Sequence, residues 1–132
     1  MQEYKQLLAP LVADCEAKND IKQLYAAVSA AAMQQVKPVW GQKDNKKAAC
    51  YFSAEFLIGR VIYANLYNLG LLEQTRQWFA ENGRDPNLLE GVDDADLGNG
   101  GRGRRAAGVR DAAATCGYVL DGYGSRYRDG VV

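Results

Sequence analysis

Apolar residues recur at three- and four-residue spacings through residues 4–39, in a stretch that is rich in Ala, Leu, Gln and Lys. The clearest series is Ile21, Leu24, Tyr25, Val28 and Ala32. This period is typical of helices that bury one face, so amphipathic helices are predicted here.

Two breaks and one end are expected within this helical stretch. Pro10 is expected to interrupt the first helix, and the polar step at residues 18–20 separates it from the second. Asn19 or Asp20 is placed to cap the second helix, because a short polar side chain accepts hydrogen bonds from the first N–H groups of a helix. That helix should end near Pro38, since proline disfavours helical geometry in the residue before it.

The pattern changes at residues 48–52, a short apolar run with two aromatic residues, which predicts a buried strand. Helical spacing returns after Ser53 and is expected to end at Gly70, with the glycine in the left-handed conformation. A further helix is predicted from Leu71 to about Glu81, ending at Asn82 and Gly83.

The last third of the chain changes in charge as well as in pattern. Residues 81–96 are acidic, and residues 97–105 are rich in glycine and arginine. Residues 106–116 have alanine-rich helical character, and residues 118–132 have a strand pattern interrupted by tyrosine and glycine. The predicted fold is mostly α with a few short β-strands (α+β), in one domain over residues 1–132 that comprises a helical segment, 1–46, and a second segment, 47–132.

The composition is that of an ordinary globular chain. Hydrophobic residues make up 48% and charged residues 24% of the 132 positions, which argues against disorder throughout. The 16 basic and 16 acidic side chains balance, so the overall charge provides no attraction to nucleic acid or to membranes. Residues 1–4 lack a signal-peptide pattern and no apolar run is long enough to span a membrane, so a cytoplasmic location is expected.

The residues that usually bind metals are scarce. Histidine is absent, and the three cysteines, Cys15, Cys50 and Cys116, show no CxxC spacing. No metal site is therefore expected. The odd number and wide separation of the cysteines predict reduced thiols and no disulfide framework.

Gly98, Gly100 and Gly103 have a G-x-G-x-x-G spacing. Such glycines let backbone amides approach a phosphate at the positive end of a helix dipole. Two alternatives stay open: a dinucleotide-binding turn, although residues 91–96 lack the pattern of the strand that it needs, and a tight turn into a helix with no ligand. A P-loop is excluded, because no Lys-Ser or Lys-Thr follows the glycines.

Three segments resemble the sequence motifs of glycogen and maltodextrin phosphorylases. In the order that the family has them, they are residues 53–60 (SAEFLIGR), residues 97–107 (LGNGGRGRRAA) and residues 122–130 (GYGSRYRDG). The residues before Lys46 resemble the family only in helical character.

The resemblance implies an α-glucan phosphorylase, which uses inorganic phosphate to release glucose 1-phosphate from an α-1,4-glucan, with pyridoxal phosphate as the cofactor of the full-length family. It places Asn99, Gly100 and Gly101 nearest the sugar and phosphate, with Glu55 close behind them. Glu55 is equally well interpreted as a carboxylate in the first turn of a helix.

The resemblance also implies what this chain lacks. The family's Schiff-base lysine belongs to its C-terminal domain, so we expect no bound cofactor, no catalytic residue and no catalysis by these 132 residues alone. Any binding of α-glucan or sugar phosphate is expected to be weak, and self-association stays open.

Where the chain departs from the family, large apolar residues are replaced by charged or small ones. Arg102, Arg105 and Arg110 stand at apolar positions of the family. The other departures are Val109, Ser125, Asp129 and Val132. An unpaired arginine buried in a full-length enzyme would cost several kcal/mol, whereas on the surface of a shortened protein it would keep the protein soluble. A truncated and resurfaced fragment, natural or engineered, is therefore expected.

The basic residues also suggest an alternative function. A nucleic-acid-binding surface would be formed by Arg102, Arg104, Arg105, Arg110, Arg126 and Arg128 with the nearby tyrosines. The acidic residues of 81–96 should offset the field of these arginines, and a solvated helix face is the simpler interpretation. Binding to membranes is not expected.

Overall fold

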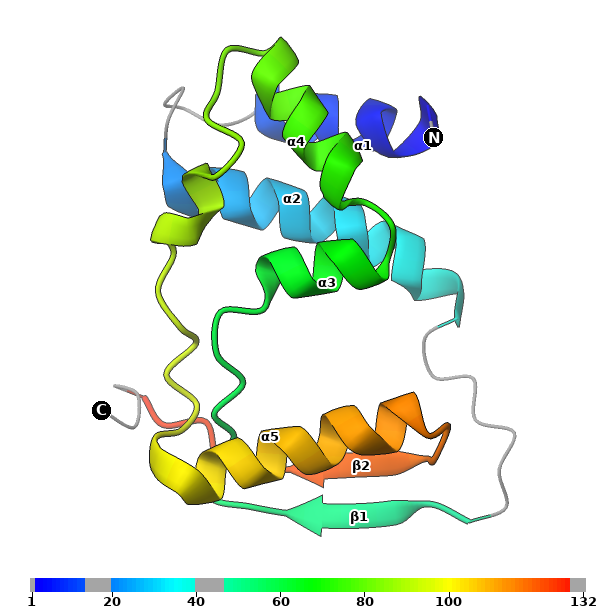
Figure 1. Ribbon diagram of the computed structural model, residues 1–132, viewed down its shortest axis with the longest axis vertical. Coiled ribbons are helices and arrows are strands. Elements are labelled where there is room, and N and C mark those ends of the chain that lie inside the picture. Colours follow the sequence, from blue (N-terminus) through cyan, green and yellow to red (C-terminus); the bar gives the residue numbers. More distant parts are fainter. Residues whose placement is uncertain (1, 14–19, 40–46, 129–132) are drawn as a thin grey trace. The chain divides into compact units, whose positions relative to one another are not determined.

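The computed structural model describes residues 2–13, 20–39 and 47–128. Helices predominate and two short strands pair, which confirms the predicted fold class (Figure 1). The helices are α1 (Gln2–Ala13), α2 (Ile21–Val36), α3 (Ile62–Asn68), α4 (Leu72–Glu81) and α5 (Gly100–Thr115), with 3-10 turns η1 (Lys37–Val39) and η2 (Leu88–Gly91). The strands are β1 (Ala49–Phe52) and β2 (Leu120–Tyr123).

The chain forms two compact units, and each unit consists of two separate stretches of sequence. The helical unit comprises Met1–Trp40 and Arg60–Asp93, and the glycine-loop unit comprises Gly41–Gly59 and Asp94–Val132. The expected division of one domain near residue 46 did not anticipate this interleaving. The motifs at residues 53–60 and 97–107 thus come together mainly within the glycine-loop unit.

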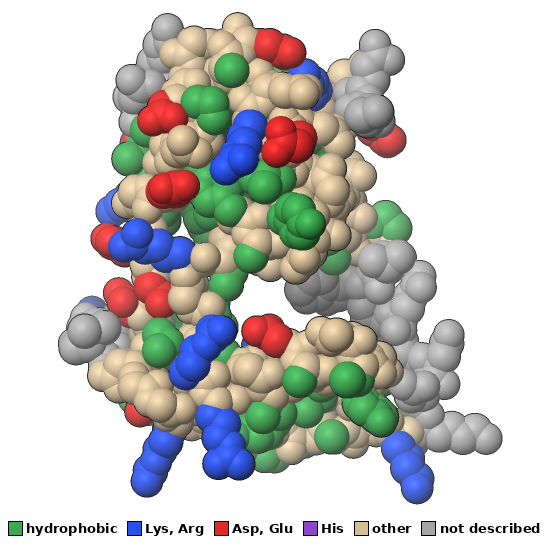
Figure 2. Space-filling view, in the orientation of Figure 1, with side chains coloured by type: hydrophobic (Ala, Val, Ile, Leu, Met, Phe, Trp, Pro, Cys, Tyr) green, Lys and Arg blue, Asp and Glu red, His purple; other side chains and the backbone are tan. Residues whose placement is uncertain are grey.

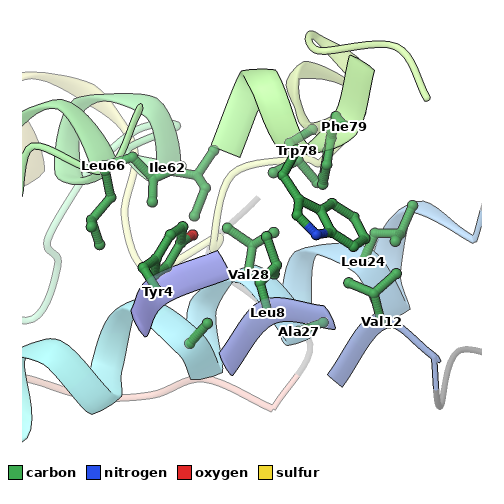
Figure 3. Close-up of a cluster of buried hydrophobic side chains, with 13 residues drawn as sticks. Tyr4, Leu8, Val12, Leu24, Ala27, Val28, Ile62, Leu66, Trp78 and Phe79 are labelled. Carbon is green, nitrogen blue, oxygen red and sulfur yellow. The ribbon is translucent and has the colours of Figure 1, made fainter. Parts of the chain in front are cut away.

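The core of the helical unit lies among α1, α2, α3 and α4 (Figure 3). Phe79 and Leu24 are fully buried in it, and α2 contributes a buried face at the predicted spacing. The whole cluster is Tyr4, Leu8, Val12, Leu24, Ala27, Val28, Ala31, Ile62, Leu66, Leu71, Trp78, Phe79 and Leu89. Burial of these side chains provides the driving force that holds the short helices together, because helices of this length are marginal in water on their own.

Pro10 lies inside α1, so the expected break at this residue is wrong. Leu8 and Val12 are buried on either side of it in the sequence, while Pro10 itself is exposed. Burying two such side chains stabilises by about 1.5–3 kcal/mol each, which offsets the roughly 3 kcal/mol that proline costs inside a helix. Tertiary packing therefore carries the helix through the proline.

The predicted limits of α2 are confirmed. The Asp20 side chain accepts hydrogen bonds from the backbone N–H groups of Lys22 and Gln23 at 2.9 and 3.2 Å, and α2 ends at Val36, two residues before Pro38. Asn19, the alternative cap, lies outside the described residues.

The turns on either side of α4 also follow the prediction. Gly70 has φ +69°, and its N–H donates to the Tyr67 carbonyl in a turn after the last residue of α3. Gly83 has φ +65° two residues after the end of α4. These left-handed conformations suit glycine because it has no Cβ, so the predicted ends of both helices follow from local chemistry.

In the glycine-loop unit, β1 and β2 pair in parallel, with Ala49 opposite Leu120 and Phe52 opposite Tyr123, and α5 contacts β2. The predicted strand at residues 48–52 is confirmed, but its predicted burial is wrong. Phe52 is 76% exposed and stacks on Tyr123, with ring centroids 5.1 Å apart. The reason is that the side chains of a strand project above and below the sheet, and no helix of the described chain makes extensive contact with β1.

The expected helix directly after Ser53 is wrong, because residues 53–61 are irregular and α3 begins at Ile62. The backbone N–H of Phe56 donates to Leu97 at 2.8 Å, and that of Leu57 donates to Gly103 at 3.0 Å. These bonds to distant residues use N–H groups that a helix would have bonded internally. Long-range contacts therefore override the local helical pattern.

The region from residue 118 onward contains one strand of four residues, β2, within the described chain, where the sequence predicted a strand pattern to residue 132. Asp129, Gly130 and Val132, which the sequence comparison singled out, lie outside the described residues, as does Cys15. Among the helices that the structure describes, none is both long enough and apolar enough to cross a membrane.

Candidate functional site: the glycine loop

The glycine loop, residues 97–101, leads directly into α5. Asn99 has extended backbone angles, φ −136° and ψ 167°, and Gly100, the first residue of α5, has φ +65°. A residue with a side chain is strained at such a positive φ, so the turn into α5 requires glycine at position 100. The first N–H groups of any α-helix lack partners within the helix, and they lie at the positive end of its dipole.

Gly98 and Gly103 are needed for a different reason, which is close packing. A Cβ at Gly98 would lie 2.8 Å from the Leu57 nitrogen, and a Cβ at Gly103 would lie 3.1 Å from the same atom. The loop and the first turn of α5 therefore pack directly on the backbone of residues 55–57. Gly98 and Gly103 are both buried, so their lack of side chains serves the fold and leaves no surface for a ligand.

At position 101, neither a positive φ nor close packing requires glycine. Its φ is not positive, and an added Cβ would meet no atom within 4 Å. Glycine in a helix costs up to about 1 kcal/mol relative to alanine, so the fold would be more stable with alanine here. Gly108 in the middle of α5 has the same open surroundings. The two positions therefore form a matched pair, one beside the loop and one remote from it.

The structure brings the predicted site residues together. The Asn99 N–H donates to Oε2 of Glu55 at 3.0 Å, across 44 positions of sequence, and Gly100 and Gly101 follow Asn99 directly. Glu55 does not lie in a helix, so its interpretation as a carboxylate in the first turn of its own helix is wrong. Its carboxylate instead lies at the start of another helix, α5.

Residues that the sequence did not single out complete this arrangement. The Ser53 hydroxyl donates to the Glu55 carbonyl at 2.7 Å and accepts from the Glu55 N–H at 3.3 Å. The Leu97 carbonyl accepts from the Phe56 N–H at 2.8 Å. The motif at residues 53–60 was recognised as a segment, but nothing in the sequence links it to a partner more than 40 positions away.

The dinucleotide-binding interpretation is not supported by the fold. A strand should lead into such a loop, whereas η2 and irregular chain occupy residues 88–99. Within the described chain no group of three or more Cys, Asp or Glu side chains is arranged to hold a metal ion.

The arginines of α5 are exposed, and Figure 2 shows basic side chains that project from the glycine-loop unit. Two of them contact their own unit. The Arg104 guanidinium donates to the Leu57 carbonyl at 3.5 Å, and the Arg110 guanidinium lies over the Phe56 ring, 5.7 Å from its centroid. Arg102, Arg105 and Arg110 are thus surface residues here, and the nucleic-acid surface that they suggested stays a prediction.

The geometry defines a class of site: a glycine loop that opens a helix beside a parallel strand, held against a carboxylate from another motif. No family model matches the chain. It is 37% identical to glycogen phosphorylase of Chlamydia pneumoniae over 117 residues, which are 83% of this chain and 14% of that protein. It is 44% identical to maltodextrin phosphorylase of Streptococcus pneumoniae over 96 residues, 72% of this chain and 12% of that protein.

A mammalian relative matches over a shorter stretch. The liver form of human glycogen phosphorylase is 42% identical over 86 residues, 64% of this chain and 10% of that protein. The chain is therefore homologous to one segment of the glycogen and maltodextrin phosphorylases, and the resemblance of its motifs to this family is confirmed. It spans between 10% and 14% of the length of these three relatives.

Proposed function

We propose that the glycine loop forms one wall of an α-glucan and phosphate site of the phosphorylase type, and that these residues do not catalyse phosphorolysis by themselves. The observation that carries this proposal is the open space at Gly101, in the first turn of α5, where the fold itself has no need of glycine. A bound sugar or phosphate oxygen can approach the backbone there without meeting a side chain.

The chemistry available at the loop supports binding more than catalysis. The described residues around it offer backbone N–H groups and the Asn99 side-chain amide. Backbone amides at a helix N-terminus favour anions such as phosphate, and side-chain amides bond to the hydroxyl groups of sugars. Asn99, Gly100 and Gly101 are the proposed ligand contacts.

Pyridoxal phosphate, the cofactor of the full-length family, supplies proton transfer through its own phosphate group when it is bound. The described residues do not fit its covalent attachment at the loop. Lys47, the one lysine described in the glycine-loop unit, lies beside Ala113 and Tyr118, near the opposite end of α5. We therefore assign no step to this cofactor and propose phosphorolysis only for a longer protein that contains this segment.

We also propose that the protein is cytoplasmic and that it can self-associate. Cys50 and Cys116 are exposed and free, as expected of a protein in the reducing environment of the cytoplasm. Phe52 and Tyr123 present an exposed aromatic pair, which favours self-association at high concentration.

Isothermal titration with glucose 1-phosphate and with a maltooligosaccharide tests the binding proposal. Gly101→Ala should weaken binding at least several-fold, because its methyl group occupies the open space, while Gly108→Ala should not. Both substitutions replace a helical glycine with open surroundings, so both should stabilise α5 by up to about 1 kcal/mol. The proposal would be contradicted if the chain bound neither ligand, or if Gly101→Ala and Gly108→Ala changed the affinity equally.

A further inference from the structure

We infer that Glu55 is a positioning residue: its carboxylate holds the Asn99 N–H and so fixes the glycine loop in its ligand-binding conformation, while the ligand itself contacts the loop backbone. This inference rests on the proposed function and changes the role that the sequence comparison gave to Glu55. It begins from one bond, the 3.0 Å contact between the Asn99 nitrogen and Oε2 of Glu55.

Three backbone groups of residues 97–103, at Leu97, Asn99 and Gly103, bond to residues 55–57. The Leu97 carbonyl accepts from the Phe56 N–H and the Gly103 carbonyl from the Leu57 N–H, so the first residue of the loop and a residue just after it are held by backbone bonds. The third attachment, at Asn99, lies between the other two and is made by a side chain. Truncation of the Glu55 side chain therefore removes the bond at Asn99 and leaves the two backbone bonds, at Leu97 and Gly103, intact.

The position of Glu55 is itself determined by its neighbours. The Ser53 hydroxyl bonds to both the carbonyl and the N–H of Glu55, which fixes the backbone from which the carboxylate extends. Gly103 allows the carboxylate to approach, since a Cβ there would lie 3.3 Å from Oε2. A half-buried carboxylate held in this way has little freedom to move towards a ligand.

The hydrogen bond between the Asn99 N–H and Glu55 also affects the conformation at Gly100. Asn99 has extended backbone angles and Gly100 has φ +65°, so the chain reverses its local conformation between these two residues. A hydrogen bond on the Asn99 N–H fixes the peptide plane directly before this reversal. The carboxylate also places a negative charge at the N-terminus of α5, which is favourable for the helix dipole.

Amide hydrogen exchange of the folded protein tests the positioning role directly. Glu55→Ala should accelerate exchange at the Asn99 N–H by about tenfold or more, because a hydrogen bond to a charged group is lost. Glu55→Gln keeps an acceptor oxygen on a side chain of the same length and should restore most of the protection. Glu73→Ala removes the same charge from the first turn of α4 and should leave Asn99 unchanged.

Titration with glucose 1-phosphate provides the second measurement. Glu55→Ala should weaken binding, and Glu55→Gln should bind within about threefold of the unsubstituted chain, since the loop keeps its conformation. If Glu55→Gln weakened binding as much as Glu55→Ala while exchange at Asn99 stayed slow, the carboxylate would contact the ligand and the inference would be wrong. Unchanged exchange at Asn99 in Glu55→Ala would also overturn it.

The two proposals fail in different ways. If the unsubstituted chain binds neither glucose 1-phosphate nor maltooligosaccharide, the proposed function is wrong. The exchange experiment still reports whether Glu55 holds the loop, because it needs no ligand. Glu55→Ala could also lower the overall stability. Global unfolding would accelerate exchange throughout the glycine-loop unit, whereas a local opening would accelerate it at Asn99 and not in Glu55→Gln.

Discussion

The hydroxyl groups of Tyr4 and Thr75 share a buried hydrogen bond of 3.0 Å, which joins α1 to α4 across 71 positions of sequence. The Thr75 hydroxyl also donates to the Leu71 carbonyl at 2.9 Å, so its proton is already used and Tyr4 is the donor of the shared bond. Both residues are almost fully buried in the helical unit. A polar pair inside an apolar core specifies how two helices align, because the Tyr4 hydroxyl would be buried without an acceptor if α1 and α4 packed differently.

Tyr4→Phe should lower the free energy of unfolding by about 1 kcal/mol, since it removes one buried hydrogen bond while the Thr75 hydroxyl keeps its bond to Leu71. Thr75→Val should cost more, because it leaves the Tyr4 hydroxyl buried without an acceptor. Urea denaturation of the two variants checks this order. A Tyr4→Phe variant as stable as the parent would show that the bond contributes no net stability.

Stability should fall at high pH, and Tyr4 should account for part of the fall. Burial raises the pKa of Tyr4 above its ordinary value of 10.0. The folded state therefore keeps the phenol proton more tightly than the unfolded state, so this contribution is complete below about pH 10 and is lost as the pH rises through the raised pKa. Burial also raises the pKa of Tyr63, which adds to the same trend.

Comparison of Tyr4→Phe with the parent between pH 9 and pH 11, roughly the range in which tyrosine titrates, isolates the contribution of Tyr4. The variant should lose less stability than the parent over this range. Equal losses would mean that the Tyr4 phenol ionises with the same pKa in the folded and unfolded states.

Gly98→Ala should destabilise the glycine-loop unit by several kcal/mol, in contrast to Gly108→Ala. The new Cβ would lie 2.8 Å from the Leu57 nitrogen and 2.9 Å from the Phe56 nitrogen, and both are backbone atoms that cannot rotate away. Overpacking of this kind typically costs about 1–3 kcal/mol or more. Thermal unfolding measures the difference, and a Gly98→Ala variant with an unchanged midpoint would refute the close packing described here.

Asp20→Ala should cost about 1 kcal/mol, because the Asp20 carboxylate caps α2 through the N–H groups of Lys22 and Gln23. Asp20→Asn should retain most of the stability, since the amide oxygen also accepts these bonds. Denaturant titration of the two variants checks the cap. If both substitutions had the same effect, charge and not hydrogen bonding would explain the role of Asp20.

The exposed and buried aromatic residues provide a further contrast. Phe79→Ala should cost about 3–5 kcal/mol, because its fully buried ring fills the core of the helical unit. Tyr67→Ala, in the same unit, should change stability by less than about 1 kcal/mol, since 73% of Tyr67 is exposed. Calorimetry of the two variants measures both effects, and a large cost at Tyr67 would contradict its exposure.

The sequence by itself determined the features that depend on neighbouring residues. Asp20 caps α2, Gly70 follows α3 and Gly83 follows α4, because each depends on φ preferences or hydrogen bonds within a few positions. The family of the chain was also readable from its motifs, since these are local strings of residues. Its glycine spacing indicated an approach to the start of a helix, and α5 does begin at Gly100.

The tertiary structure alone decided which distant segments meet. Pro10 stays within α1 because Leu8 and Val12 are buried together, and residues 53–61 stay irregular because Phe56 and Leu57 bond to the region around the glycine loop. Burial of Leu8 and Val12 offsets the roughly 3 kcal/mol that proline costs inside a helix. At residues 53–61, hydrogen bonds to residues 40 or more positions away outweigh local helical preferences, which amount to less than about 1 kcal/mol per residue for most residue types.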